Sequence, residues 1–238
     1  MMNETYKIYC LSYDNPARLS DMQMRFSTIG ASCSFYEGVP PTDPRILGKT
    51  PVDSINKVWS CMYGHLDMIH KFYNSSDADF GIFCEDDILI DRNLLKYIPE
   101  IISDFRSIDI DILLLGYLIP SAIDSSTPNF TIRKSNHDTQ LSYYDYPEDL
   151  WGTQMYMISR EYAKVIIDKY SNGYADQTLV DSSLTHFSAD WTITKDGRRA
   201  LVYPLLSIED GKSKYSHEGQ ARYHAQCYSA NFDESRFI

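Results

Sequence analysis

The sequence predicts an α/β fold, in which helices flank a central, mostly parallel sheet. Near the N-terminus, an apolar run with strand propensity at residues 6–11 precedes a helix at 18–29 and a second strand at 32–39. A strand, helix, strand order of this kind begins a parallel sheet. Further along, residues 112–116 form a continuous apolar run, which is typical of a strand buried on both faces.

The remaining elements are predicted from the same kinds of pattern. We expect a long amphipathic helix ending near residue 73, a strand at 80–84, and a helix after Asp91 that Pro99 must kink or shorten. Toward the C-terminus we expect a helix at 160–170 and strands at 130–133, 141–144, 153–158 and 200–204. The irregular composition of residues 118–147 indicates a functional loop or a small insertion. Residues 176–194 show no clear pattern, and the tail from Ser207 is polar.

Composition and charge exclude several classes of protein. The chain has 238 residues, of which 43% are hydrophobic and 23% charged, as in ordinary globular proteins. A net charge of −11 argues against non-specific nucleic-acid binding, which needs a basic surface. Residues 1–7 lack the pattern of a signal peptide, no apolar run is long enough to span a membrane, and the five cysteines form no Cys-x-x-Cys pair. We therefore expect a cytoplasmic protein with reduced thiols.

Three consecutive carboxylates, Glu85, Asp86 and Asp87, follow the strand expected at 80–84. Unpaired ionised carboxylates are costly to bury, unless they hold a cation or a substrate at the carboxyl end of a strand, where α/β sheets bind ligands. If the strand continued, Glu85 and Asp87 would share one side, and Asp86 would face away in a structural hydrogen bond. Mg²⁺ and Mn²⁺ prefer oxygen ligands of this kind and leave coordination positions open for a diphosphate. The alternative is a solvated turn with incidental acids.

Two other segments hold residues that could serve the same site. Leu11, Ser12 and Arg18 follow the first strand, where Arg18 would either grip a diphosphate through two hydrogen bonds or lie on a helix surface. Gly64 lies inside the long helix, where glycine costs about 1 kcal/mol relative to alanine, so we expect a close approach of the sheet or a ligand there. Next to it, His65 is either part of that site or a hydrogen-bonded core histidine.

Four segments together resemble glycosyltransferase family 25, which contains lipopolysaccharide-modifying and procollagen galactosyltransferases. They are Leu11-Ser12 with Arg18 after the first strand, Cys-Met-Tyr-Gly-His-Leu at 61–66, Phe-Cys-Glu-Asp-Asp-Ile at 83–88, and the run at 151–159 that is similar to Gly-Thr-x-x-Tyr-x-Ile-Ser. Their order and spacing agree with the family over about residues 5–210. Two features depart from it: Gly64 stands where the family usually has serine, and the family's downstream Pro-Val-Asp element has no clean counterpart.

The resemblance implies a GT-A-type, Rossmann-like fold, a UDP-sugar donor, Mn²⁺ or Mg²⁺, and transfer with inversion to a hydroxyl of a glycan or a protein side chain. It implies Glu85 and Asp87 as the pair of acids at the site, with Asp87 as the direct metal ligand and Glu85 near the metal or the donor. Asp86, between them, is a further candidate for binding the nucleotide. We predict one domain over residues 1–238, since no repeat or linker is visible. A nucleotide-binding part would cover about 5–117, and an acceptor-side part about 118–238.

Inverting transfer needs a catalytic base that takes the acceptor's proton. Two aspartates are candidates for this base. We prefer Asp190, which precedes an aromatic residue that could stack on a sugar, over Asp181; for either, capping a helix is the alternative. After the last strand, Lys212 and Ser213 would contact the diphosphate. His217 is predicted either as a third metal ligand or as a surface histidine.

The sequence thus predicts a metal-dependent glycosyltransferase that moves a hexose from a UDP-sugar to a hydroxyl acceptor. A nucleotidyltransferase with a similar nucleotide-binding sheet is the nearest alternative. A catalytically inactive carbohydrate-binding protein of the same fold is the alternative from a different class. The donor sugar, the acceptor and the oligomeric state, a homodimer included, stay open.

Overall fold

The computed structural model describes residues 5–49, 53–124, 126–213, 215 and 217–238, and for Asp53 and Ser54 the backbone alone. Residues 1–4, on which part of the signal-peptide prediction rests, lie outside this range. Within the described part of the chain, no helix is both long enough and apolar enough to cross a membrane.

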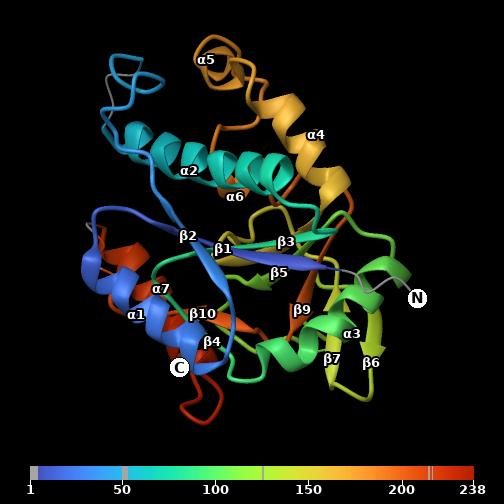
Figure 1. Cartoon of the computed structure of the whole chain (residues 1–238). Coiled ribbons are helices and arrows are strands. Elements are labelled where there is room, and N and C mark those ends of the chain that lie inside the picture. Colours follow the sequence, from blue (N-terminus) through green and yellow to red (C-terminus); the bar gives the residue numbers. More distant parts are fainter. Residues whose placement is uncertain (1–4, 50–52, 125, 214, 216) are drawn as a thin grey trace.

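In the part of the chain that the structure describes, ten strands form one sheet, and its main path runs in the order β2-β1-β3-β8-β5-β9-β7-β6. Figure 1 labels most of these strands. In this order the strands are Cys33–Glu37, Tyr6–Ser12, Phe80–Glu85, Met155–Ser159, Ile112–Gly116, Arg199–Tyr203, Leu141–Tyr144 and Ile132–Asn136. Along this path β8 and β7 run against the other strands, so the predicted mostly parallel sheet is confirmed. Two short strands, β4 (Ile88–Ile90) and β10 (Ser207–Glu209), pair with each other, and β10 also pairs with the end of β5.

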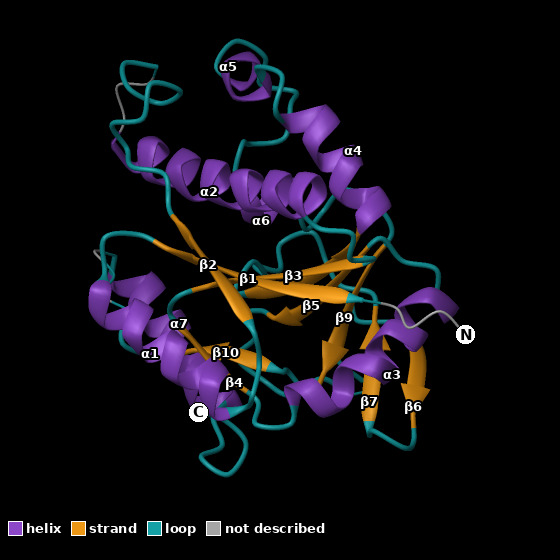
Figure 2. Ribbon diagram, in the orientation of Figure 1, coloured by secondary structure: helices purple, strands orange, loops and turns teal. Residues whose placement is uncertain are grey.

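Helices cover both faces of the sheet (Figure 2). The long helix α2 (Asp53–Ser75) and α4 (Arg160–Tyr170) lie on one face, and α1 (Pro16–Thr28) and α3 (Leu94–Ser107) lie on the other. Each face has its own apolar core, with Met62, Phe72 and Ile166 in the first and Met22, Phe26 and Ile98 in the second. Strand β5 between them is buried throughout, as its apolar run predicts. The predicted α/β fold is therefore confirmed.

Four segments differ from the sequence prediction or were left unassigned by it. Helix α3 starts after Asn93 rather than at Asp91, and it continues past Pro99 to Ser107, so proline does not shorten it. The segment at 118–147 carries the hairpin of β6 and β7, which joins the sheet beside β9 instead of standing apart. Residues 176–194 contain the short α6 (Ala189–Thr192), after α5 (Tyr174–Thr178). The polar tail forms α7 (Glu218–Asn231), which buries only Cys227 fully among its residues and so has no apolar stripe to reveal it.

The glycine inside α2 marks a close approach to the sheet, as expected. A Cβ atom at Gly64 would lie 2.9 Å from both δ carbons of Leu11 on β1. The backbone of α2 therefore packs directly on the end of β1, and it brings the residues around Gly64 to the edge of the sheet where Glu85 lies.

A second close approach fixes β10 against β5, and it yields a test. A Cβ at Gly116 would lie 2.0 Å from Oγ of Ser207 and 2.9 Å from its backbone oxygen. We expect Gly116→Ala to lower the free energy of unfolding by about 1–3 kcal/mol, because β10 must move away. In urea unfolding, the control Gly219→Ala should be neutral or slightly stabilising, since Gly219 is exposed near the start of α7. Equal midpoints for Gly116→Ala and the wild type would contradict this packing.

Candidate active site

The site lies at the carboxyl ends of β1 and β3. These strands are parallel neighbours with Leu11 opposite Glu85, so their ends meet at one edge of the sheet. The antiparallel β8 starts at the same edge, and the Glu85 backbone N–H donates to the Gln154 carbonyl over 3.2 Å. Gly152 and Thr153, which precede β8, are thereby brought to the carboxylates.

Arg18 pairs with two carboxylates of the acidic triplet, Asp86 and Asp87. One of its terminal nitrogens lies 3.5 Å from Asp86 Oδ1 and 3.4 Å from Asp87 Oδ2. The other donates to Ser213 Oγ over 2.8 Å, and Ser213 Oγ donates to Asp87 Oδ2 over 3.0 Å. Ser12 Oγ donates to Asp86 Oδ2 over 2.7 Å, so Asp86 has a hydrogen bond as expected. It does not face away, however, because it shares Arg18 with Asp87 and borders the same hollow as Asp87. Five of the residues predicted for the site therefore form one connected cluster.

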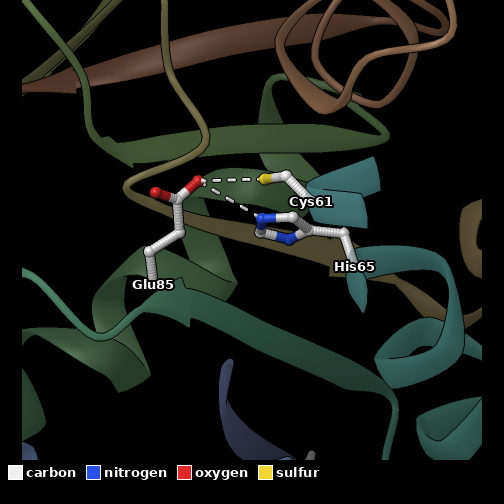
Figure 3. Close-up of side chains that lie close together, drawn as sticks. All are labelled: Cys61, His65 and Glu85. Carbon is white, nitrogen blue, oxygen red and sulfur yellow. Dashed lines mark hydrogen bonds and ion pairs between the residues drawn. The ribbon is translucent and has the colours of Figure 1, made fainter. Parts of the chain in front are cut away.

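Glu85 points to a different set of partners on α2 (Figure 3). Its Oε1 lies 3.3 Å from His65 Nε2 and 3.9 Å from Cys61 Sγ, and the Thr153 hydroxyl also lies close to its carboxylate. Burial alone would raise the pKa of Glu85, but the hydrogen bond and charge of His65, with Thr153 and Arg18, outweigh it and lower that pKa. Glu85 is therefore held ionised beside a histidine that the sequence left open as a core residue.

Asp190 lies near Glu85, and the segment before β8 holds its carboxylate in place. Its Oδ1 accepts from the backbone N–H groups of Gly152 (2.9 Å) and Thr153 (3.1 Å) and from Thr153 Oγ1 (3.1 Å). The residue that caps α6 is Ser188, so Asp190 does not serve as the cap. Burial and the charge of Glu85 raise the pKa of Asp190, although its three hydrogen bonds oppose the shift.

Three other predicted residues lie elsewhere. Asp181 is exposed in a turn, where its Oδ1 accepts from the backbone and hydroxyl of Ser183. The Lys212 ammonium lies 3.6 Å from Asp21 rather than at the triplet, and His217 is exposed just before α7. The structure does not bring these side chains together with Asp87, and their predicted roles stay predictions.

His224, rather than the predicted His217, borders the candidate site. His224 on α7 binds Glu209 through Nδ1, and Tyr215 Oη lies 2.8 Å from the same nitrogen. Its Nε2 is buried and has no hydrogen-bond partner among the described residues. A carboxylate on one ring nitrogen and a free second nitrogen is the arrangement found in metal-binding histidines. Because α7 has no apolar stripe, the sequence held no signal that His224 rather than His217 would turn inward.

Three adjoining hollows form a continuous cleft along the sheet edge. A hollow of about 370 Å³ is lined by Leu11, Tyr13, Arg18 and Glu85, and one of about 360 Å³ by Arg18, Glu85, Asp87, Asp190, Glu209 and His224. The largest, of about 680 Å³, is lined by aromatic side chains together with Asp190, among them Trp59, Trp151, Phe187 and Trp191. Arg18, Glu85 and Asp87 border the first two hollows, while Asp190 and Trp151 border the last two. The hollow beside Leu11 and Tyr13 thus holds Arg18 and the carboxylates together, and the largest hollow is the aromatic one.

The electrostatics of the middle hollow suit a divalent cation. Burial, with the charges of Glu85 and Glu209, raises the pKa of Asp87 to about 7, even though Arg18 opposes the shift. One guanidinium therefore does not balance the carboxylates that face this space, and a bound cation would. His224, whose buried Nε2 has no hydrogen-bond partner among the described residues, is one of the residues that line the same hollow. The charge and the ligand types of these residues thus fit the metal ion that the family resemblance implies, although Asp87 and His224 belong to no group of three ligand atoms within 4.8 Å of one another among the described residues.

Comparisons with known proteins identify no family for this chain. No family model matches the sequence. No curated protein matches it either. Solved structures that resemble it include mannose-1-phosphate geranyltransferase from Thermus thermophilus, with 11% identity over 84% of this chain and 73% of that one and a TM-score of 0.44. Another is a glycosyltransferase involved in glycosylation of the major capsid of PBCV-1, with 13% identity over 94% and 99% and a TM-score of 0.34. A third is the inositol-1-phosphate CTP transferase from T. maritima, with 10% identity over 94% and 77% and a TM-score of 0.38.

Likenesses this weak do not assign an activity, and the activities in those names belong to those proteins. The resemblance to glycosyltransferase family 25 continues to rest on the four sequence segments alone.

Proposed function

We propose that the protein is a metal-dependent transferase that acts on a nucleotide-linked sugar. The observation that carries the proposal is the continuous cleft, in which Arg18 and buried carboxylates short of positive charge adjoin the aromatic hollow. Ligands of open α/β sheets bind at this edge, outside the carboxyl ends of the strands. The nucleotide would lie beside Leu11 and Ser12, and its diphosphate beside Arg18 and Ser213.

Asp87 and His224 would hold the cation, with Glu85 close by. When bound, Mn²⁺ or Mg²⁺ supplies charge stabilisation to the departing diphosphate. Arg18 adds a fixed positive charge on the same side, since it already spans Asp86, Asp87 and Ser213. Glu209 orients the His224 ring through Nδ1, which leaves Nε2 free to act as a ligand.

The reaction we propose is glycosyl transfer from a UDP-sugar with inversion at the anomeric carbon. The acceptor would enter from the aromatic hollow, and the Asp190 carboxylate would take the proton of its hydroxyl. The new bond from the acceptor oxygen to the anomeric carbon forms as the bond to the diphosphate oxygen breaks, and UDP leaves with that electron pair. Asp190 suits this step because Oδ1 is held by three donors, so Oδ2 can receive the proton while the side chain stays in place.

Nucleotidyl transfer is the second candidate, and the loop after β1 argues against it. A nucleoside triphosphate is commonly held by backbone N–H groups of a glycine-rich loop at a helix N-terminus. Here residues 12–18 contain no glycine, Pro16 at the start of α1 has no N–H to donate, and Asn15 already caps the Arg18 amide. Few amides remain for a triphosphate, and we favour a diphosphate held by side chains and a cation.

Product analysis separates the candidates. Purified protein is incubated with Mn²⁺, a panel of sugar nucleotides and hydroxyl acceptors, and separately with nucleoside triphosphates and sugar 1-phosphates. Glycosyl transfer predicts release of UDP, and nucleotidyl transfer predicts release of pyrophosphate. If the protein forms neither product but binds glycans, it is the inactive carbohydrate-binding protein and the proposal fails.

The choice between the two C-terminal histidines can be tested by metal binding. We expect His224→Gln to weaken Mn²⁺ binding at least about 10-fold in a calorimetric titration, because a ligand with a fixed orientation is lost. His217→Gln is the matched control and should bind Mn²⁺ as the wild type does, since its side chain is exposed outside the cleft. Weakening by His217→Gln alone would restore His217 as the ligand and contradict the assignment to His224.

A further inference from the structure

Cys61, His65 and Glu85 form a compact group of three different metal-binding side chains (Figure 3). Their ligand atoms all lie within 4.8 Å of one another, and no other such group of three His, Cys, Asp or Glu is found in the described part of the chain. Cys61 and His65 are four residues apart on α2, which places them on one face of the helix. Glu85 reaches the same point from the end of β3. Two rigid elements thus converge on one position.

We propose that Cys61, His65 and Glu85 bind a zinc ion, a site distinct in its chemistry from the one proposed for the hard cation. Zinc is bound in proteins by cysteine sulfur, histidine nitrogen and carboxylate oxygen, whereas Mn²⁺ and Mg²⁺ prefer oxygen. The set of one sulfur, one nitrogen and one oxygen is therefore suited to zinc. Asp87 and His224, by contrast, offer no sulfur.

The distances are close to those of a tetrahedral zinc site. Zinc bonds of about 2.0–2.1 Å to nitrogen and oxygen and about 2.3 Å to sulfur place the ligand atoms about 3.3 Å (N to O) and about 3.6 Å (S to O) apart. In the structure His65 Nε2 lies 3.3 Å from Glu85 Oε1, and Cys61 Sγ lies 3.9 Å from the same oxygen. A movement of a few tenths of an ångström by the thiol would bring its distance from Glu85 to the tetrahedral value, and its distance from the ligand nitrogen of His65 is already within 4.8 Å.

The surroundings of the three side chains also suit a metal. His65 is fully buried, and its other ring nitrogen, Nδ1, lies 3.0 Å from the Tyr156 hydroxyl. A partner of this kind orients the ring of a metal-binding histidine. Cys61 and Glu85 both line the hollow of about 370 Å³, so an ion bound by three protein ligands would keep a fourth position open to that space.

Metal titration tests the site without reference to any activity. The full chain, reduced and freed of metal, is titrated with Zn²⁺ in competition with a chromogenic chelator. We expect one high-affinity zinc per chain. Loss of a residue that only orients a metal ligand weakens metal binding by about 10–100-fold. We expect Cys61→Ser and His65→Asn, which each remove a ligand, to weaken zinc binding by more than that. Cys33→Ser and His70→Asn are the controls and should retain the affinity, because Cys33 lies on β2 and His70 contacts Ser171.

Cobalt gives a second readout, on the wild type alone, that does not depend on how well a variant folds. Co²⁺ in this site should show the near-ultraviolet absorption of a cobalt–thiolate bond, and an equivalent of Zn²⁺ should remove it. Absence of both the zinc equivalent and the cobalt–thiolate absorption would overturn the proposal, as would retention of wild-type zinc affinity in Cys61→Ser. Because both readouts are of binding, they can succeed or fail whether or not the protein transfers a sugar.

Discussion

Asp87→Asn is expected to lower metal-dependent transfer by about 10³-fold or more while leaving the fold intact. The variant keeps the shape of the side chain but loses the charge that would hold the cation, and several kcal/mol of charge stabilisation are lost with it. Arg18 retains Asp86 as a partner, so the cluster around it should persist. The check is the rate of sugar-nucleotide turnover at saturating Mn²⁺, with circular dichroism to confirm the fold.

Although Asp87→Asn is expected to lower activity, it should leave the stability of the metal-free protein unchanged or raise it. Burial and the charges of Glu85 and Glu209 disfavour an ionised Asp87, so a neutral side chain there relieves repulsion in the metal-free protein. We expect Asp87→Asn to melt at the same temperature as the metal-free wild type or higher, and to lose the stabilisation that Mn²⁺ gives. Asp168→Asn, an exposed residue of α4, is the control and should keep both activity and the response to Mn²⁺. Undiminished turnover in Asp87→Asn would remove this residue from the site.

Asp190→Asn is expected to lower kcat by about 10²–10⁴-fold, the range found when a general base is lost. Asparagine can still accept the hydrogen bonds of Gly152 and Thr153 through Oδ1, so the loop before β8 should stay in place. Binding of the nucleotide and of Mn²⁺ should be unchanged. Asp181→Asn is the matched control and should have wild-type kcat, because its carboxylate lies in an exposed turn.

At saturating Mn²⁺, where a bound cation would keep Asp87 ionised, the acid limb of the pH–rate profile gives an independent check on Asp190. Its raised pKa means that protonation begins at a higher pH than for an ordinary aspartate, and the protonated form cannot accept the proton of the acceptor. The rate should therefore fall as pH is lowered through a value above the ordinary aspartate range of about 4. Loss of activity in Asp181→Asn with full activity in Asp190→Asn would reverse the assignment of the base.

The parts of this structure that the sequence predicted are those with a local signal. The apolar run at Ile112–Gly116 and the helical spacing around Met62 identified the core elements. The cost of burying acids predicted a candidate site at the end of β3. Gly64 gave a local sign of close packing, and its neighbour proved to be Leu11 of the sheet.

The parts that could not be predicted depend on how distant segments meet. His224 enters the cleft because Glu209 on β10 and Tyr215 hold its ring, and no periodicity in α7 marks its inward face. Thr153 reaches Glu85 only because β8 runs antiparallel to β3. Cys61 and His65 lie in the long helix that the sequence predicted, but their approach to Glu85 follows from the packing of α2 on the sheet. Local patterns predict elements, whereas the site is made by their contacts.

The most direct test of a metal-dependent site for a nucleotide-linked sugar is a calorimetric titration of nucleoside diphosphates with and without Mn²⁺. UDP, GDP, CDP and ADP are titrated into the wild-type chain in Mn²⁺ and then in a chelator. The hollow that Arg18 and Asp87 both border predicts that one of these nucleotides, UDP by our proposal, binds in Mn²⁺ and loses that affinity in the chelator. Failure of all four to bind in Mn²⁺, or binding that is unchanged by the chelator, would contradict the account.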